Sequence, residues 1–172
     1  MLSIYFFNLY LFLESNTIIS NKKPTKQSTT FIRNGIIYGS NLANDGNTYQ
    51  ESFEISYFQK PTCSSTMMAN ATNKFHFWQV DLQSKYIITQ VKIWNQKSYL
   101  EDLKNFQVIL SKKENFLDIP YNICCSYGIN NQSIIKCQCP PVLARYVTIY
   151  KNPGYDYLCL CEVEVYGRLP NG

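Results

Sequence analysis

Seven cysteines are the residues of this 172-residue chain whose types and spacing most plainly indicate chemistry. Their density is typical of proteins that fold in an oxidising compartment and form disulfides, and an odd count leaves at least one thiol unpaired or paired between chains. Zinc binding is the competing hypothesis, although Cys-x-Cys steps and a vicinal pair differ from the usual zinc-knuckle spacing. The cysteines are Cys63, Cys124, Cys125, Cys137, Cys139, Cys159 and Cys161.

A second candidate site combines a turn with a distant carboxylate. Asp45, Gly46 and Asn47 form a turn sequence, and Glu162 lies in the last predicted strand. Calcium takes six to eight oxygen ligands, which two carboxylates and turn carbonyls can supply, and a glycine lets the backbone fold its carbonyls inward. The structural alternative is that Asp45-Gly46 is only a turn and Glu162 only a solvated strand residue.

Catalysis and nucleic-acid binding find no support in the residues. One histidine, no nucleophile elbow and no glycine-rich phosphate loop leave no catalytic constellation, so we expect a protein that is not an enzyme. We interpret His76 as a loop or core-edge residue rather than a ligand. The net charge is +4, and the lysines and arginines are scattered, which argues against a nucleic-acid partner.

The N-terminal segment indicates the compartment. Residues 2–13 read LSIYFFNLYLFL, which is too short to span a bilayer but fits the hydrophobic region of a signal peptide. We therefore expect residues 1–15 to be a signal peptide and the protein to be secreted; a buried N-terminal strand or a gene-model artefact are the alternatives. Two glycosylation sequons, Asn70-Ala-Thr72 and Asn131-Gln-Ser133, agree with secretion.

The elements that must position these residues are short strands. The chain is rich in residues that favour strands, with 14 Tyr and 10 Phe, and no segment has a long helical period. A single capped helical turn is expected at residues 40–46, followed by a long irregular stretch over 47–73. Short strands with irregular connections predict an all-β fold, a β-sandwich or jelly roll. Strands are predicted near residues 77–82, 86–94, 106–110, 145–150 and 159–166.

Alternation assigns the faces of two of these strands. In the strand over 86–94, one face is predicted to carry Ile87, Thr89, Val91 and Ile93. In the strand over 159–166, one face is predicted to carry Cys159, Cys161, Val163 and Val165, and the opposite face Leu160, Glu162, Glu164 and Tyr166.

Four segments, at residues 23–30, 40–48, 77–82 and 158–167, occur in an order and spacing that resemble the F-type lectin (fucolectin) domain. This family is a branch of the discoidin-like, galactose-binding-domain fold. Ala144-Arg-Tyr-Val147 also matches a strand of the family, and the terminal Cys-Glu-Val-Glu-Val-Tyr-Gly is the most specific piece. The resemblance covers about residues 18–168 and implies a jelly-roll β-sandwich domain that binds carbohydrate.

The resemblance also implies a structural calcium ion that clamps the loops near the sugar site. The implied ligand positions are Leu42, Asp45, Asn47, Thr62, Cys161 and Glu162, with Thr62 standing where serine is usual.

The resemblance further implies two disulfides. One joins Cys63 to Cys161, and the other joins one of Cys124/Cys125 to one of Cys137/Cys139, of which we favour Cys125–Cys137. Cys159 shares a predicted strand face with Cys161 and is the candidate for the odd thiol.

The sugar motif of the family is only partly present. The motif is a His, then 24 residues, Arg-x-Asp, four more residues and Arg or Lys, because planar guanidinium groups suit paired sugar oxygens. In this chain Gln96 occupies the motif position of the first Arg, and Ser98 occupies that of the Asp. The motif position of the second cation carries neither Arg nor Lys. The His position is Ala71 by counting, or Ser65 by alignment on Cys63. Candidate sugar contacts are Ser65, Gln96, Lys97, Tyr99 and Lys104.

These observations predict a secreted, calcium-stabilised carbohydrate-binding module with altered or weakened fucose specificity. Its expected partner is a glycan or glycoprotein. The sequence leaves open whether the protein forms a homo-oligomer. The alternative is a non-lectin adhesion or structural module that binds protein or anionic lipid through its loop tips, with peripheral membrane contact only. The loop Ser64–Phe75, which carries Met67 and Met68, is the feature that favours the alternative.

Overall fold

The computed structural model describes residues 16–51, 60–68, 75–129, 131–151 and 156–170. The expected signal peptide and the sequon at Asn70 lie outside these residues, whereas Asn131 of the other sequon is exposed. No helix among the described residues has the length and apolar character needed to cross a bilayer.

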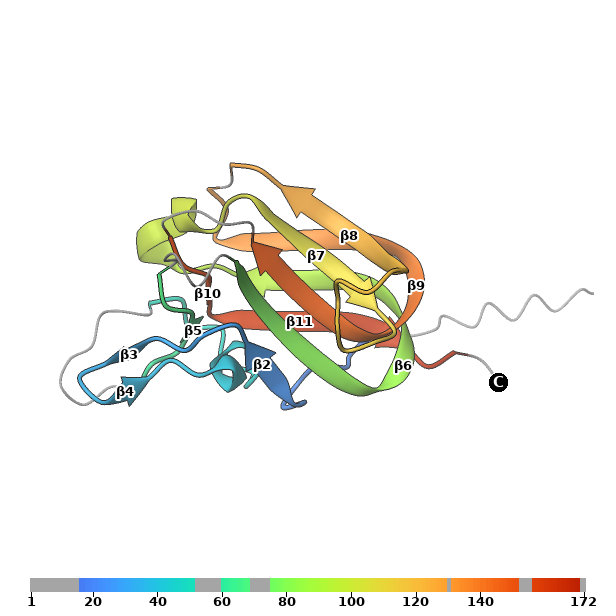
Figure 1. The fold of residues 1–172 in the computed structure, drawn as a ribbon, viewed down its shortest axis with the longest axis horizontal. Coiled ribbons are helices and arrows are strands. Elements are labelled where there is room, and N and C mark those ends of the chain that lie inside the picture. The colour runs from blue at the N-terminus through green and yellow to red at the C-terminus, as the bar shows by residue number, and fades with distance from the viewer. Residues whose placement is uncertain (1–15, 52–59, 69–74, 130, 152–155, 171–172) are drawn as a thin grey trace, which may run out of the picture.

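Antiparallel strands are the main regular structure of the described residues (Figure 1). The strands are β1 (Thr17–Ile18), β2 (Thr25–Gln27), β3 (Ile32–Arg33), β4 (Ile36–Ile37), β5 (Ser64–Ser65), β6 (His76–Trp94), β7 (Phe106–Ser111), β8 (Tyr121–Tyr127), β9 (Ile134–Lys151), β10 (Cys159–Leu160) and β11 (Glu162–Arg168). Two short 3-10 helices, η1 (Ser40–Ala43) and η2 (Lys97–Asp102), interrupt them.

Two long strands, β6 and β9, contribute to both layers of a sandwich. In the first layer, residues 76–82 of β6 lie between β2 and the end of β9, which also pairs with β7, and β7 pairs with β8. In the second layer, residues 86–94 of β6 lie between β11 and the start of β9, and β11 pairs with β1. The register of β6 shifts between Asp81 and Tyr86, where the strand passes from one layer to the other. The predicted all-β jelly-roll fold is confirmed.

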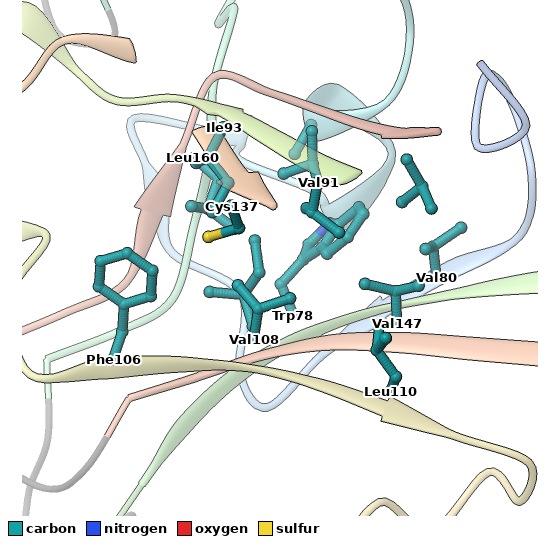
Figure 2. Packing of buried hydrophobic residues seen from close by; sticks show 14 of the residues in the cluster. Trp78, Val80, Val91, Ile93, Phe106, Val108, Leu110, Cys137, Val147 and Leu160 are labelled. Carbon is teal, nitrogen blue, oxygen red and sulfur yellow. The ribbon is translucent and has the colours of Figure 1, made fainter. Parts of the chain in front are cut away.

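The core lies between the layers. Trp78 and Val80 of the first layer and Val91 and Ile93 of the second layer are all nearly inaccessible to solvent. Figure 2 shows these side chains together with Phe106, Val108, Leu110, Cys137, Val147 and Leu160. Burial of this apolar surface is the main driving force that holds the two layers together.

Two disulfides link the layers along one side of the sandwich. They are Cys125–Cys137, as predicted, and Cys124–Cys139. Both join β8, at the edge of the first layer, to the beginning of β9, at the edge of the second layer. The bridges therefore hold two sheet edges that no backbone ladder joins to each other.

The predicted face of the strand over 86–94 is partly wrong. The buried residues are Ile88, Val91, Ile93 and Trp94, whereas Ile87 and Thr89 are only half-buried. The register shifts between Ile88 and Gln90, and this bulge inverts the alternation along the strand. The helical turn at residues 40–46 is present as η1, with Gly46 at a φ of 90°, but Gly39 precedes it and no side chain caps it.

The predicted two-faced pattern of the last strand is also partly wrong. Leu160 and Glu162 are as buried as Cys161 and Val163. The segment is divided into β10, which pairs with β5, and β11, which pairs with β6. Because the segment leaves one ladder and joins another at Cys161, simple alternation does not decide which of its residues meet solvent.

Candidate functional site

The turn at Asp45 and the carboxylate of Glu162 lie together. The backbone N–H of Gly46 donates a hydrogen bond of 3.0 Å to Glu162 Oε2. The short helix η1 carries the chain into this turn, and Glu162 begins β11, opposite Trp94 at the end of β6. The fold therefore joins two segments that are 116 residues apart in the sequence.

Glu162 is a buried carboxylate, with a relative exposure of 2%. Among the residues that the structure describes, no lysine or arginine forms an ion pair with it. Burial raises the pKa of Glu162 to about 7, and the hydrogen bond from the amide of Gly46 opposes this shift. Buried charges are normally paired with an opposite charge or with a metal, so this environment suits a cation. The alternative of a solvated strand residue is wrong.

Of the other predicted calcium ligands, Leu42 and Asn47 lie beside the turn and Cys161 precedes Glu162, whereas Thr62 lies on a third segment. Asp45 Oδ1 accepts a hydrogen bond of 2.8 Å from the N–H of Asn47, and Leu42 lies within η1. Thr62 and Glu162 each directly adjoin one cysteine of the observed disulfide Cys63–Cys161, which confirms the predicted pairing. The bridge therefore holds the segment of Thr62 against the start of β11. Cys159 is buried and takes part in none of the three disulfides, which agrees with its prediction as the odd thiol.

The predicted sugar residues divide into exposed and buried groups. Lys97 is exposed, Tyr99 is 47% exposed, and Lys104 is half-buried just beyond η2. Gln96 is buried, and its amide atoms have no hydrogen-bond partner in the described part of the chain. Ser65 is also buried, and its hydroxyl donates to the carbonyl of Thr66 at 3.2 Å. Lys97, Tyr99 and Lys104 are therefore accessible to an external partner, whereas Ser65 and Gln96 are not. We call these three accessible residues the η2 rim.

A buried lysine fixes the end of η2, and the sequence analysis missed it. Lys151, at the end of β9, is 1% exposed and donates to the carbonyls of Asp102 and Tyr157. Its Nζ lies 3.1 Å from Asp156 Oδ2, and Tyr157 Oη donates a 2.7 Å hydrogen bond to Asp102 Oδ2. Burial lowers the pKa of Lys151, and the Asp156 carboxylate opposes this shift. No local sequence signal distinguishes this lysine from the exposed ones.

His76 is structural in this arrangement. It is fully buried at the start of β6, and its Nδ1 lies 2.9 Å from Thr66 Oγ1. The same hydroxyl accepts a hydrogen bond of 2.9 Å from the N–H of Leu158. Its burial removes it from contact with an external ligand and lowers its pKa.

Known proteins share this fold, and some of them share about a third of the sequence. A family model described as a NedA-like, galactose-binding domain matches residues 42–149. Fucolectin-6 of Anguilla japonica is 32% identical over 161 residues, which cover 92% of this chain and 79% of that protein. An F-lectin (fucolectin) from Morone saxatilis serum superposes with a TM-score of 0.75 at 22% identity, over 90% of this chain and 48% of that one. A Streptococcus pneumoniae fucose binding module superposes with a TM-score of 0.67 at 26% identity, over 90% and 98% of the two chains.

Proposed function

The chain belongs to the F-type lectin (fucolectin) family of galactose-binding-domain folds, and from that premise we propose that it is a secreted, calcium-stabilised carbohydrate-binding module. The single observation that carries the proposal is the meeting of the Asp45 turn and the buried Glu162 carboxylate at one end of the sandwich. The relatives are lectins and binding modules, which agrees with the prediction that the chain is not an enzyme. Secretion is supported by three disulfides, which persist in oxidising compartments.

Calcium fits the donors at this end. The side chains of Asp45 and Glu162 would supply carboxylate oxygens, which calcium prefers, and a cation would compensate the buried charge of Glu162. The remaining oxygens would come from the segments of Leu42, Asn47, Thr62 and Cys161. The bound ion would supply positive charge that ties η1, the Thr62 segment and β11 together.

The η2 rim is the proposed contact surface for the glycan. The exposed ring of Tyr99 can pack against the apolar face of a sugar, and Lys97 and Lys104 can donate hydrogen bonds to hydroxyl groups. The rim has no guanidinium fork, and Ser98 Oγ donates to Glu51 Oε2 at 2.7 Å. A fork fixes paired sugar oxygens in a way that a lysine cannot. We therefore propose an altered or weakened preference for fucose.

A glycan array in millimolar calcium tests this function. The protein is expected to bind a defined subset of glycans, and Tyr99→Ala is expected to weaken that binding at least fivefold. Tyr49→Ala is the matched control, since Tyr49 is 53% exposed and is not part of the rim. No detectable binding to fucosylated, galactosylated or mannosylated glycans on the array would contradict the proposal.

A non-lectin function is the second candidate. Met67 and Met68 are adjacent, follow β5, and are 49% and 59% exposed. Two exposed thioethers at a loop can insert into the boundary of a lipid bilayer, and the net charge of +4 favours an anionic surface. Sedimentation with phosphatidylserine vesicles tests this function. Loss of vesicle binding in the Met67→Ser/Met68→Ser double variant would support it.

A further inference from the structure

The outer face of the first layer carries aromatic rings where a sheet facing water normally carries polar side chains. Phe77, Gln79 and Asp81 alternate along β6 with core residues at 78, 80 and 82. The connection between β7 and β8 folds against this face, because Gln79 Nε2 donates to the carbonyl of Glu114 at 2.9 Å. The connection between β7 and β8 therefore forms a raised border on this face of the sheet, which is not flat.

Four rings form a connected cluster there. The ring centroids of Phe77 and Phe116 are 5.2 Å apart, and those of Phe116 and Tyr150 are 5.6 Å apart. Phe75 completes the cluster at 6.3 Å from Phe77 and 6.0 Å from Tyr150. Phe75 is 38% exposed and Leu117 is 53% exposed, so part of this apolar surface meets solvent.

The cluster borders a hollow of about 510 Å³. Phe75, Phe77, Phe116 and Leu117 form its apolar walls, while Lys26, Glu114 and Asn115 supply polar groups. This volume and this mixture of aromatic walls with a few polar groups lie in the range of small-molecule sites.

An ion pair marks the polar end of the hollow. Lys26 Nζ lies 2.6 Å from Glu114 Oε1, and both side chains are well exposed. The same two residues border a second hollow of about 170 Å³, which continues along β6 toward Gln79 and Asp81. Exposed ion pairs contribute little stability, so hydroxyl groups can replace this one readily.

We propose that this hollow is a second carbohydrate subsite, which holds a neutral pyranose ring. The apolar face of the ring would pack on the phenylalanines, and its hydroxyl groups would exchange hydrogen bonds with Lys26, Glu114 and Asn115. The opposite charges of Lys26 and Glu114 cancel, which favours a neutral ligand over a charged one. The choice of a sugar rests on the proposed function, whereas the residues of the hollow are separate from the η2 rim.

Saturation-transfer NMR tests the subsite with lactose, maltose and N,N′-diacetylchitobiose as probes. The test uses the full chain carrying Lys97→Ala, Tyr99→Ala and Lys104→Ala, which remove all three side chains of the η2 rim. At least one disaccharide is expected to keep receiving saturation in this background. Adding Phe75→Ala is expected to weaken that binding at least fivefold. Tyr121→Ala is the matched control, because Tyr121 is 37% exposed and borders neither hollow, and it is expected to change binding less than twofold.

The outcomes separate the two proposals. If the glycan array is positive but the rim-disabled protein binds no disaccharide, the second subsite is wrong and the proposed function stands. If the glycan array detects no binding but a disaccharide still receives saturation that depends on Phe75, the second subsite is supported and the η2 rim is not a receptor. Binding that Phe75→Ala leaves unchanged in a protein with native near-ultraviolet circular dichroism would also overturn the subsite.

Discussion

The amide of Gly46 and the carboxylate of Glu162 are 3.0 Å apart, although 116 residues separate them in the sequence. This hydrogen bond places a positively polarised backbone group beside a carboxylate that is almost inaccessible to solvent. One such bond does not replace the hydration that a buried carboxylate loses. Under the calcium proposal, a cation at this pair would compensate the buried charge of Glu162.

Replacing Glu162 with glutamine tests the metal ligand. Glu162→Gln keeps the shape of the side chain and removes its charge, so we expect at least tenfold weaker calcium binding by calorimetry of chelator-treated protein. Glu164→Gln is the matched control on the same strand, and it is expected to bind calcium like the wild type.

The change in melting temperature of Glu162→Gln, compared in calcium and in chelator, shows whether Glu162 is a calcium ligand or only a structural side chain. In calcium, Glu162→Gln is expected to lower the melting temperature, because the bound ion stabilises only the folded state. In chelator, the variant should be at least as stable as the wild type, since it no longer buries an uncompensated charge. An equal loss of stability in both conditions would show that Glu162 is not a calcium ligand.

Lys151 is predicted to position the η2 rim without touching the glycan. Lys151→Met removes the hydrogen bonds to the carbonyls of Asp102 and Tyr157, which should cost about 1–3 kcal/mol of unfolding free energy. Amide hydrogen exchange across residues 97–102 should accelerate, and glycan affinity should fall. Lys136→Met is the control, because Lys136 is an exposed lysine on the same strand. Unchanged exchange at η2 in Lys151→Met would contradict a positioning role.

The two disulfides between β8 and β9 are predicted to act redundantly. Each closes a short loop, with sequence separations of 15 and 12 residues, and one loop lies within the other. Removing either pair of cysteines should therefore cost less than the roughly 3 kcal/mol expected for an isolated loop of this length. Removing both pairs should cost more than the sum of the single losses, as measured by urea denaturation. Strict additivity would contradict a shared loop-closing role.

An ion pair at the corner of β6 gives a prediction of pH dependence. Arg145 donates to both carboxylate oxygens of Asp81, at 2.7 and 2.8 Å, and this interaction lowers the pKa of Asp81. A carboxyl whose pKa is lowered by folding stabilises the protein above its unfolded pKa, and that stability is lost as the pH falls through the folded pKa. Asp81→Asn should therefore cost at most about 1 kcal/mol at pH 7, because the pair is partly exposed. The difference from the wild type should shrink below about pH 4. A difference that is constant with pH would contradict this account.

The sequence predicted the fold because several segments agree with one another. Strands are predicted near residues 77–82, 106–110 and 159–166 and are observed there, and the resemblance that joins them covers nearly the whole chain. The disulfides Cys63–Cys161 and Cys125–Cys137 follow from that resemblance rather than from spacing. The bulge between Ile88 and Gln90 could not be predicted, because it depends on pairing with a distant strand.

The candidate site was less predictable than the fold. Burial of Ser65, Gln96 and Lys151 is decided by segments far away in the sequence, so polar residue types alone suggested exposure. The strand β8 was also missed, because its side chains are exposed or half-buried and give no apolar alternation. The beginning of β9 was missed although buried Ile135, Cys137 and Cys139 alternate there with exposed residues.

The central claim is that bound calcium shapes the η2 end of the sandwich into a receptor for a glycan, and calorimetry of one array-selected glycan tests it directly. The titration is run in calcium, in chelator, and after calcium is restored. We predict at least tenfold weaker binding in chelator and full recovery with calcium, and by reciprocity the glycan should tighten calcium binding by the same factor. Equal glycan affinity with and without calcium, or no glycan binding in either condition, would contradict the account.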